Sequence, residues 1–264
     1  MPEQIRTAAV LGAGVMGSAI AAHLAGAGIR THLLDIVPPN LEGDDLKNPA
    51  KRTAFAAGGI QKALKAKPAA FYDPSAAKLV TPGNMDDDLE RLGECDLVIE
   101  AVPERMDIKQ SVYNKIVPHL SETCILASNT SGLSIAAMND TLPEELQSRF
   151  LVMHFFNPVR YMRLLELVAG PKTDPAVMEQ ITAFGEFLGK GIVYGKDTAN
   201  FVANRIGVYG MMQTFSALTE FGLTIEEVDK IAGKPMGRPK SAAFRTGDVV
   251  GIDTFIHVAQ NCYD

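Results

Sequence analysis

Residues 7–28 read TAAVLGAGVMGSAIAAHLAGAG, and this stretch decides the fold. A short apolar run ends at Leu11, the loop 12–17 has the form Gly-x-Gly-x-x-Gly, and small and apolar residues then fill 18–28. An apolar run that ends in glycines and continues into small residues is typical of a buried strand, a tight turn and a buried helix. The stretch therefore predicts a strand–turn–helix unit with a glycine-rich turn.

Each glycine of this loop has a separate physical use. Gly12 permits the tight turn, Gly14 lets a phosphate approach the backbone, and Gly17 lets the helix pack closely on the strand. The first helical turn, with Val15 and Met16, offers free N–H groups and the positive end of the helix dipole. The loop therefore predicts a site for the pyrophosphate of a dinucleotide.

A carboxylate strengthens this interpretation, because a glycine loop alone is a weak signal. Asp35 ends the second predicted strand, 18 residues after Gly17. A carboxylate at this place accepts hydrogen bonds from the ribose hydroxyls and repels a 2′-phosphate. The predicted cofactor is therefore NAD rather than NADP.

Further short apolar runs follow, and helical patterns separate several of them. The runs without alternation predict buried strands at 31–36, 78–81, 96–102, 123–128, 150–155, 164–168 and 191–194. Helical patterns at 106–117 and 134–138 lie between strands. Such alternation favours an α/β fold, namely a Rossmann-type, doubly wound, mostly parallel sheet.

The pattern changes near Thr198 to helices alone. A long periodic segment covers 201–221, and a second covers 224–232. The sequence thus predicts an NAD-binding domain at 1–198 and a smaller all-helical domain at 199–264. Another helix is expected to begin at 250–253, so the helical domain is predicted to be incomplete and the chain to be part of a longer protein.

Composition excludes several classes of function. The net charge is −6 and no long basic run occurs, which speaks against a nucleic-acid partner. No stretch has the roughly 20 apolar residues that a membrane span requires. The three cysteines are far apart and form no metal-binding spacing, so no metal and a cytoplasmic location are expected.

The segment 37–77 is too long for a plain connection between elements. It begins with two prolines and an acidic patch, and its second part carries Arg52, Lys62, Lys65 and Lys67. The sequence predicts a mobile loop followed by a projecting helix with a basic, solvated face.

Polar residues appear where later apolar runs end. SNTSG follows one run at 128–132, and HFFNP follows another at 154–158. Glu166 lies inside the apolar run LLELV, where a buried carboxylate needs a partner, and His154 is the candidate. Because ligands of a doubly wound sheet bind beyond the carboxyl ends of its strands, these groups indicate chemistry on a hydroxyl or carbonyl.

These segments resemble the L-3-hydroxyacyl-CoA dehydrogenase family of fatty-acid β-oxidation. The resemblance runs through GAGVMG, VIEAVPE, SNTSG, HFFNP, LLELV, KDT with FVANRI, and the terminal GDVVGIDT. HFFNP with a glutamate twelve residues after its histidine is far more specific than the glycine loop. The spellings GRPKSAAFRT and TPGN are most similar to the dehydrogenase part of large proteins fused to an enoyl-CoA hydratase.

The resemblance implies a role for each catalytic residue. His154 takes the proton of the 3-hydroxyl group, and Glu166 orients its ring and stabilises the imidazolium. Ser131 and Asn204 hydrogen-bond the reacting oxygen. Histidine suits proton transfer because its ordinary pKa lies near neutrality.

The resemblance also implies ligand contacts and partners. Asn157, Glu104 and Lys109 are expected at the nicotinamide and its ribose. Lys62 would contact the nucleotide part of an acyl-CoA substrate, although a purely solvated role is equally consistent with its surroundings. A homodimer through the helical domain, and a fused or partner enoyl-CoA hydratase, are further implied.

Two departures from the family pattern concern the helical domain. Ala199-Asn200 replaces the usual Pro-Gly, and asparagine tolerates the left-handed backbone that such a turn needs. The stretch Gly237-Arg238-Pro239-Lys240 replaces a more apolar one.

Two other functions stay open. One is a different two-domain dehydrogenase of the 6-phosphogluconate or 3-hydroxyisobutyrate type, which normally uses a lysine of the helical domain. Lys230, Lys234 and Lys240 lack the expected surroundings for that role. The other is a non-catalytic NAD-binding fragment.

Overall fold

The computed structural model describes residues 5–252 and residue 256. Contacts divide the chain into two compact units. The first comprises Met1–Thr130 and Ser134–Asp197, and the second comprises Ser131–Leu133 and Thr198–Asp264. The short loop Ser131–Leu133 thus groups with the helical part of the chain, from which it is far in sequence.

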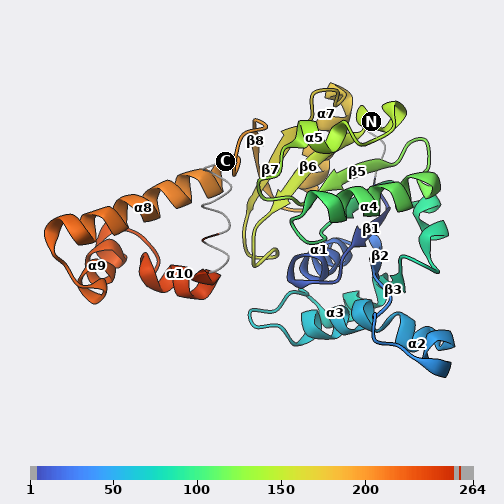
Figure 1. Ribbon diagram of the computed structural model, residues 1–264, viewed down its shortest axis with the longest axis horizontal. Coiled ribbons are helices and arrows are strands. Elements are labelled where there is room, and N and C mark those ends of the chain that lie inside the picture. Colours follow the sequence, from blue (N-terminus) through green and yellow to red (C-terminus); the bar gives the residue numbers. More distant parts are fainter. Residues whose placement is uncertain (1–4, 253–255, 257–264) are drawn as a thin grey trace. The chain divides into compact units, whose positions relative to one another are not determined.

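An eight-stranded sheet forms the centre of the first unit, in the order β3-β2-β1-β4-β5-β6-β7-β8 (Figure 1). All neighbouring strands are parallel except β6 and β7, which pair antiparallel. The strands are β1 Thr7–Leu11, β2 Arg30–Asp35, β3 Val80–Asn84, β4 Leu97–Glu100, β5 Ile125–Ser128, β6 Phe150–Phe155, β7 Leu164–Ala169 and β8 Gly191–Gly195. The predicted doubly wound, mostly parallel sheet is confirmed.

The order of the strands determines where a ligand can bind. From β1 the chain builds β2 and β3 on one side, then returns to place β4 and the later strands on the other. The direction of winding changes between β1 and β4, and ligands of such sheets bind at the carboxyl ends of the strands there. The glycine loop follows β1 at this point.

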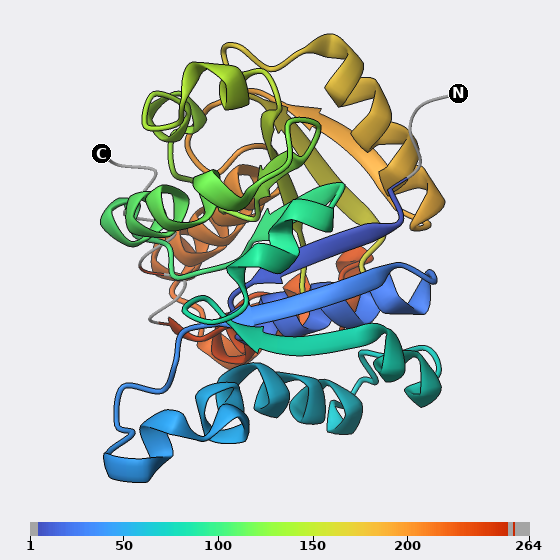
Figure 2. The same ribbon diagram turned by 90° about the vertical axis from the view of Figure 1, so that its right-hand side faces the viewer.

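Helices cover both faces of the sheet (Figure 2). Residues of α1, α3 and α7 share one hydrophobic core with the sheet, while α4 packs with α5. The α-helices of this unit are α1 Val15–Gly26, α2 Pro49–Arg52, α3 Ala54–Lys65, α4 Met106–Ile116, α5 Ile135–Asn139, α6 Glu144–Gln147 and α7 Pro175–Phe187. Sequence patterns did not predict α7, although Asp174 caps it by accepting a hydrogen bond from the N–H of Ala176 (2.8 Å).

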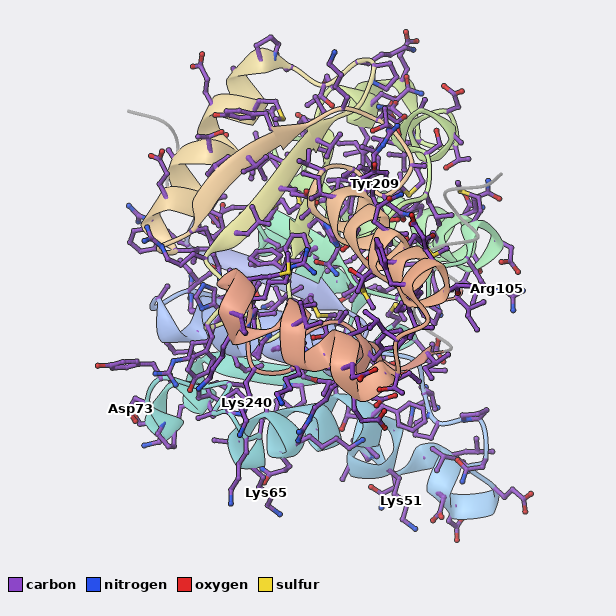
Figure 3. All side chains as sticks on the ribbon, turned by 90° about the vertical axis from the view of Figure 1, so that its left-hand side faces the viewer. Lys51, Lys65, Asp73, Arg105, Tyr209 and Lys240 are labelled. Carbon is purple, nitrogen blue, oxygen red and sulfur yellow. The ribbon has the colours of Figure 1, made fainter. Side chains whose placement is uncertain are left out.

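The segment 37–77 differs from its prediction. Helix α3 does not project, because its residues Ala56, Ile60 and Ala63 are buried and belong to the hydrophobic core around α1. Gly59 lies on the same face, where an added Cβ would be only 2.4 Å from Ser18 Oγ of α1. Small residues on this face therefore permit the close packing of α3 on α1. Lys65 lies on the opposite, exposed face and points away from the ribbon (Figure 3).

The second unit is helical as predicted, with α8 Ala203–Phe221, α9 Ile225–Ala232 and α10 Phe244–Val250. Helix α8 ends at Gly222 (φ +63°), and Thr224 and Glu227 form a reciprocal capping box at the start of α9. Asp229 accepts hydrogen bonds from the N–H groups at the start of α10, including that of Phe244 (2.8 Å). The helix expected from 250–253 lies partly outside the described residues, and α10 precedes it.

The turn before α8 has the left-handed backbone expected from Asn200. Asn200 has φ +59°, and Phe201 follows at φ +47°. An added Cβ at Gly132 would be 2.7 Å from Asn200 Oδ1, so the loop Ser131–Leu133 packs closely on this turn within the second unit. The asparagine thus replaces the usual Pro-Gly pair without loss of the turn.

His23 of α1 gives the first unit a testable response to acid. Its Nε2 donates a hydrogen bond to Leu188 O (3.1 Å), and burial, followed by the charge of Lys190, lowers the pKa of His23 to about 4. Because the folded protein holds this histidine neutral, the unfolded chain binds the proton more readily. The resulting contribution to stability is fully present at pH values above 6.5 and is lost as the pH falls from 6.5 to about 4.

The His23→Gln variant keeps an N–H donor but cannot gain a proton. When the pH falls across this range, we expect its free energy of unfolding to decrease by about 2 kcal/mol less than that of wild type. Urea unfolding at both ends of the range measures the difference. His119→Gln is the control, since its ring forms no hydrogen bond or ion pair with any other described residue. Parallel losses in wild type and His23→Gln would contradict the assignment.

Candidate active site

The glycine loop has the geometry that its spacing predicts. Gly12 has φ +98°, and an added Cβ there would lie 2.6 Å from Ala101 O. An added Cβ on Gly17 would lie 1.8 Å from Gly12 O, so no side chain fits between helix and loop. At Gly14 an added Cβ would meet nothing within 4 Å, which leaves this side of the loop open to a ligand.

The N-terminus of α1 lies directly after this open glycine. No side-chain cap occupies it among the described residues, and its first turn carries no acidic residue. Val15 is exposed, whereas Met16 is half-buried against the core. The first N–H groups of a helix have no partner within the helix, so they and the helix dipole favour an anion here.

Asp35 lies beside the loop, at the end of β2. Its Oδ2 accepts a hydrogen bond from the N–H of Ala13 (2.6 Å), and its Oδ1 accepts one from the N–H of Ile36 (2.6 Å). The carboxylate therefore contacts the loop that would carry the pyrophosphate. The order of the strands produces this contact, because β2 is the neighbour of β1 in the sheet.

A cleft of about 440 Å³ adjoins the loop. It brings together five residues singled out from the sequence, namely Gly14, Val15, Lys62, Lys67 and Asn157. The remaining walls come from the end of α3 with the segment after it, and from Pro158–Tyr161. Lys62 and Asn157 are both exposed, so their polar ends are accessible to a ligand.

A buried carboxylate organises the end of β4, and sequence patterns had not singled it out. Glu100 is 0% exposed, and its Oε1 accepts hydrogen bonds from the N–H of Val102 (2.8 Å) and from Lys109 Nζ (2.8 Å). Its Oε2 accepts from Tyr113 Oη (2.9 Å), Ser128 Oγ (2.7 Å) and again Lys109 Nζ (2.9 Å). Burial, and then the charge of Glu100, raise the pKa of Tyr113 well above its usual range, so the phenol keeps its proton and donates.

The predicted nicotinamide contacts Glu104 and Lys109 belong to this network. Lys109 is only 1% exposed, and its Nζ lies 3.4 Å from Glu104 Oε2 as well as against Glu100. Glu104 also accepts a short hydrogen bond from Thr130 Oγ1, and the N–H of Thr130 donates to Ser128 Oγ (3.1 Å). The network thus connects the ends of β4 and β5. Glu100 could have been found from the sequence, because it is a carboxylate inside an apolar run, as Glu166 is.

His154 and Glu166 form the buried pair that the sequence predicted. They lie directly opposite each other on the antiparallel strands β6 and β7, and His154 Nδ1 is 2.7 Å from Glu166 Oε2. Their side chains are 4% and 0% exposed. An ionised carboxylate only accepts hydrogen bonds, so Nδ1 carries a proton, and Nε2 is the nitrogen with the lone pair in the neutral ring. This arrangement suits a general base.

Two segments near this pair are also fixed. The N–H of Phe155 donates to Asn129 Oδ1 (2.9 Å), which ties the end of β6 to the turn after β5. The ring of Phe156 packs on that of His154 with centroids 4.3 Å apart. The histidine is therefore held by its partner and by a neighbouring ring.

The two other predicted catalytic residues belong to the second unit. Ser131 begins the loop that packs on the turn at Asn200, and Asn204 lies in the first turn of α8. Both are half-buried. The structure thus pairs His154 with Glu166 in the first unit, and it places Ser131 and Asn204 in the unit formed by the helices.

The described residues offer neither a metal site nor a membrane-spanning helix. Across 5–252 and 256, no group of three or more His, Cys, Asp or Glu side chains is arranged to hold a metal ion. In the same residues no helix combines the length and the apolar character needed to cross a bilayer.

Dinucleotide-dependent oxidoreductases combine a glycine loop after β1 with a carboxylate after β2, and the fold and loop place the chain in that class. Comparison with known proteins makes the assignment narrower. Residues 7–198 match the family model of the 3-hydroxyacyl-CoA dehydrogenase NAD-binding domain, and residues 201–264 match that of the C-terminal domain. The chain belongs to the 3-hydroxyacyl-CoA dehydrogenase family of NAD-dependent oxidoreductases.

Two relatives match this chain over nearly its whole length. A Bacillus subtilis protein named "Probable 3-hydroxyacyl-CoA dehydrogenase" is 46% identical over 271 residues, which cover 100% of this chain and 34% of that protein. A Deinococcus radiodurans protein of the same name is 45% identical, with 97% of this chain and 72% of that protein covered. The chain therefore spans about a third of the first relative.

Solved structures agree with the fold. FadB2 of Mycobacterium tuberculosis superposes with a TM-score of 0.82 at 28% identity, covering 99% of this chain and 88% of that one. The (S)-3-hydroxybutyryl-CoA dehydrogenase PaaH1 of Ralstonia eutropha gives a TM-score of 0.78 at 28% identity, covering 98% of this chain and 87% of that one.

Proposed function

We propose that this chain catalyses the NAD-dependent oxidation of L-3-hydroxyacyl-CoA to 3-oxoacyl-CoA, with His154 as general base. The observation that carries the proposal is the buried hydrogen bond between His154 Nδ1 and Glu166 Oε2 (2.7 Å), in a chain of this family. The names of two similar relatives, and the 3-hydroxybutyryl-CoA dehydrogenase activity in the name of the Ralstonia protein, support the substrate class.

In this proposal His154 Nε2 takes the proton of the 3-hydroxyl group. Bound NAD supplies the acceptor for the hydride that leaves C3. Glu166 keeps the ring in the tautomer with Nδ1 protonated and stabilises the positive charge that His154 gains. Ser131 and Asn204 are proposed to donate hydrogen bonds to the reacting oxygen.

The cofactor contacts are proposed on the first unit. Gly12, Gly14 and Gly17, with the first helical turn at Val15 and Met16, would bind the pyrophosphate, and Asp35 the adenosine ribose. Asn157, Glu104 and Lys109 would order the nicotinamide end, with Lys109 acting through its carboxylate neighbours because it is buried. Lys62, exposed at the cleft, would contact the nucleotide part of coenzyme A.

The wider setting is proposed from the relatives. A Rickettsia felis protein named "Putative fatty acid oxidation complex trifunctional enzyme" is 38% identical over 96% of this chain, which supports a role in fatty-acid β-oxidation beside a hydratase. Domains at 1–198 and 199–264, a homodimer through the helical domain and a cytoplasmic location complete the proposal.

A direct assay tests the proposed function. The full chain is mixed with acetoacetyl-CoA and NADH, and the decrease in NADH absorbance is followed. Steady oxidation of NADH that depends on acetoacetyl-CoA is expected. Tight NADH binding without turnover would favour a non-catalytic NAD-binding protein. Turnover of a phosphorylated or free hydroxy acid instead would favour the other two-domain dehydrogenases.

The cofactor assignment gives a separate prediction. Asp35→Asn keeps an acceptor for the N–H of Ala13 but removes the charge that would face a 2′-phosphate. The preference for NADH over NADPH, measured as the ratio of the two kcat/KM values, is expected to fall about tenfold or more, since such a repulsion costs at least about 1.4 kcal/mol.

The matched control is Asp44→Asn, which makes the same charge change at an exposed position of the segment after β2. Its ratio should equal that of wild type. If the ratio of kcat/KM values for NADH and NADPH is also unchanged in Asp35→Asn, Asp35 does not select between the two cofactors.

A further inference from the structure

Lys190 is a buried cation for which the proposed reaction has no use. It follows the turn at Gly189 (φ +77°), immediately before β8, and is 6% exposed. No carboxylate forms an ion pair with it among the described residues. Burial lowers the pKa of Lys190 to about 8, so its amine is mainly protonated at neutral pH. A buried ammonium without a carboxylate is costly and calls for other partners.

Its partners are backbone carbonyls of one short segment. Lys190 Nζ donates a short hydrogen bond to Val159 O and another to Met162 O (2.9 Å). The face of the Phe155 ring lies 5.8 Å away on a further side. Two carbonyls and an aromatic face account for the three N–H groups of an ammonium.

This segment is the turn between β6 and β7. The N–H groups of Tyr161 and Met162 both donate to Pro158 O (2.9 and 3.0 Å), which closes the turn. The N–H of Gly191 donates to Arg163 O (2.7 Å), so the residue after Lys190 is tied to the end of the same segment. The ammonium therefore binds two carbonyls of this turn and fixes their direction.

We propose that Lys190 is a positioning residue, whose ammonium sets the turn 158–162 and thereby fixes Asn157 at the wall of the cofactor cleft. Asn157 directly precedes this turn and lines the cleft together with Gly14 and Val15 of the glycine loop. The inference rests on the proposed contact between Asn157 and the cofactor.

An apolar side chain at 190 would leave both carbonyls without their donor. The turn would then relax toward solvent, where water can satisfy these carbonyls, and Asn157 would lose its fixed place. The effect on the cofactor thus passes through Asn157, which distinguishes positioning from a general effect on stability.

The experiment measures NADH affinity of the full chain by fluorescence titration, for wild type, Lys190→Met, Asn157→Ala and the double variant. Each single variant is expected to raise the Kd about tenfold, the equivalent of one well-placed hydrogen bond. The double variant should bind no more than about twofold weaker than Asn157→Ala, because residues that act through one another are not additive. Lys172→Met, an exposed lysine of the segment after β7, is the control and should bind as wild type does.

Two results would overturn the inference. One is a double variant whose loss of affinity equals the product of the two single losses. The other is an unchanged Kd in Lys190→Met with a lowered melting temperature, which would mean that Lys190 is purely structural. The readout is binding rather than turnover, so an inactive but NADH-binding chain would refute the proposed function and leave this test valid.

Discussion

Replacing His154 with alanine is expected to lower kcat for acetoacetyl-CoA reduction by about 10²- to 10⁴-fold, the usual contribution of a positioned acid or base. In the reduction His154 gives up the proton that it would take in the oxidation, so the same group serves both directions. The affinity for NADH should stay within about threefold of wild type, because the glycine loop and Asp35 are not altered. Turnover and fluorescence titration on the same preparations measure both quantities.

The chain offers a matched control for this variant. His32 Nε2 is 2.9 Å from Glu94 Oε1, so a second histidine–glutamate pair exists away from the proposed chemistry. His32→Ala should leave kcat unchanged. Glu166→Gln should lie between His154→Ala and wild type, since the amide still accepts from Nδ1 but carries no charge to stabilise the imidazolium. A kcat of His154→Ala within threefold of wild type would exclude the histidine as base.

Replacing Glu100 with leucine is expected to lower the free energy of unfolding by about 3–5 kcal/mol. The change removes the main counter-charge of Lys109 and leaves the hydroxyls of Tyr113 and Ser128 without their acceptor. A loss of this size is a large part of the total stability of a typical domain, which is about 5–15 kcal/mol. Urea unfolding followed by circular dichroism measures it.

A double variant separates charge from shape at this network. Removing both charges in Glu100→Leu/Lys109→Met should recover at least about half of the loss, because an apolar replacement of a buried ion pair is often neutral. The exposed pair Arg105–Asp107 is the control, and Asp107→Asn should leave the free energy of unfolding unchanged within the error of the measurement. If the double variant were as unstable as the sum of its single changes, Lys109 would not depend on Glu100 for its charge.

Local patterns in the sequence were sufficient to predict the strands of the sheet and the pairing of His154 with Glu166. The eight apolar runs correspond to the eight strands, and their ends differ by at most three residues. The pairing of Glu166 with His154 followed from the cost of burying a lone carboxylate. Asn200 was correctly expected in the left-handed region, because its type tolerates that backbone.

Other features depend on contacts that no local pattern encodes. To predict that α3 packs on α1, one would have to know that Gly59 lies against Ser18, a residue 41 positions away in the sequence. The reversal of β7 relative to β6 is a matter of sheet order rather than of hydrophobic pattern. The turn around Lys190 was not found either, because an isolated lysine after a glycine looks like any surface residue until its carbonyl partners are in place.

The antiparallel pairing of β6 and β7 has a consequence for how the His154–Glu166 pair forms. Both residues come from one hairpin, so a segment of 13 consecutive residues, 154–166, contains the whole pair. The backbone hydrogen bonds that align the two strands also bring the two side chains within reach of each other. Ordering the pair therefore costs little conformational entropy beyond that of closing the hairpin, and the register of the two strands and the contact between the two side chains arise in the same folding step.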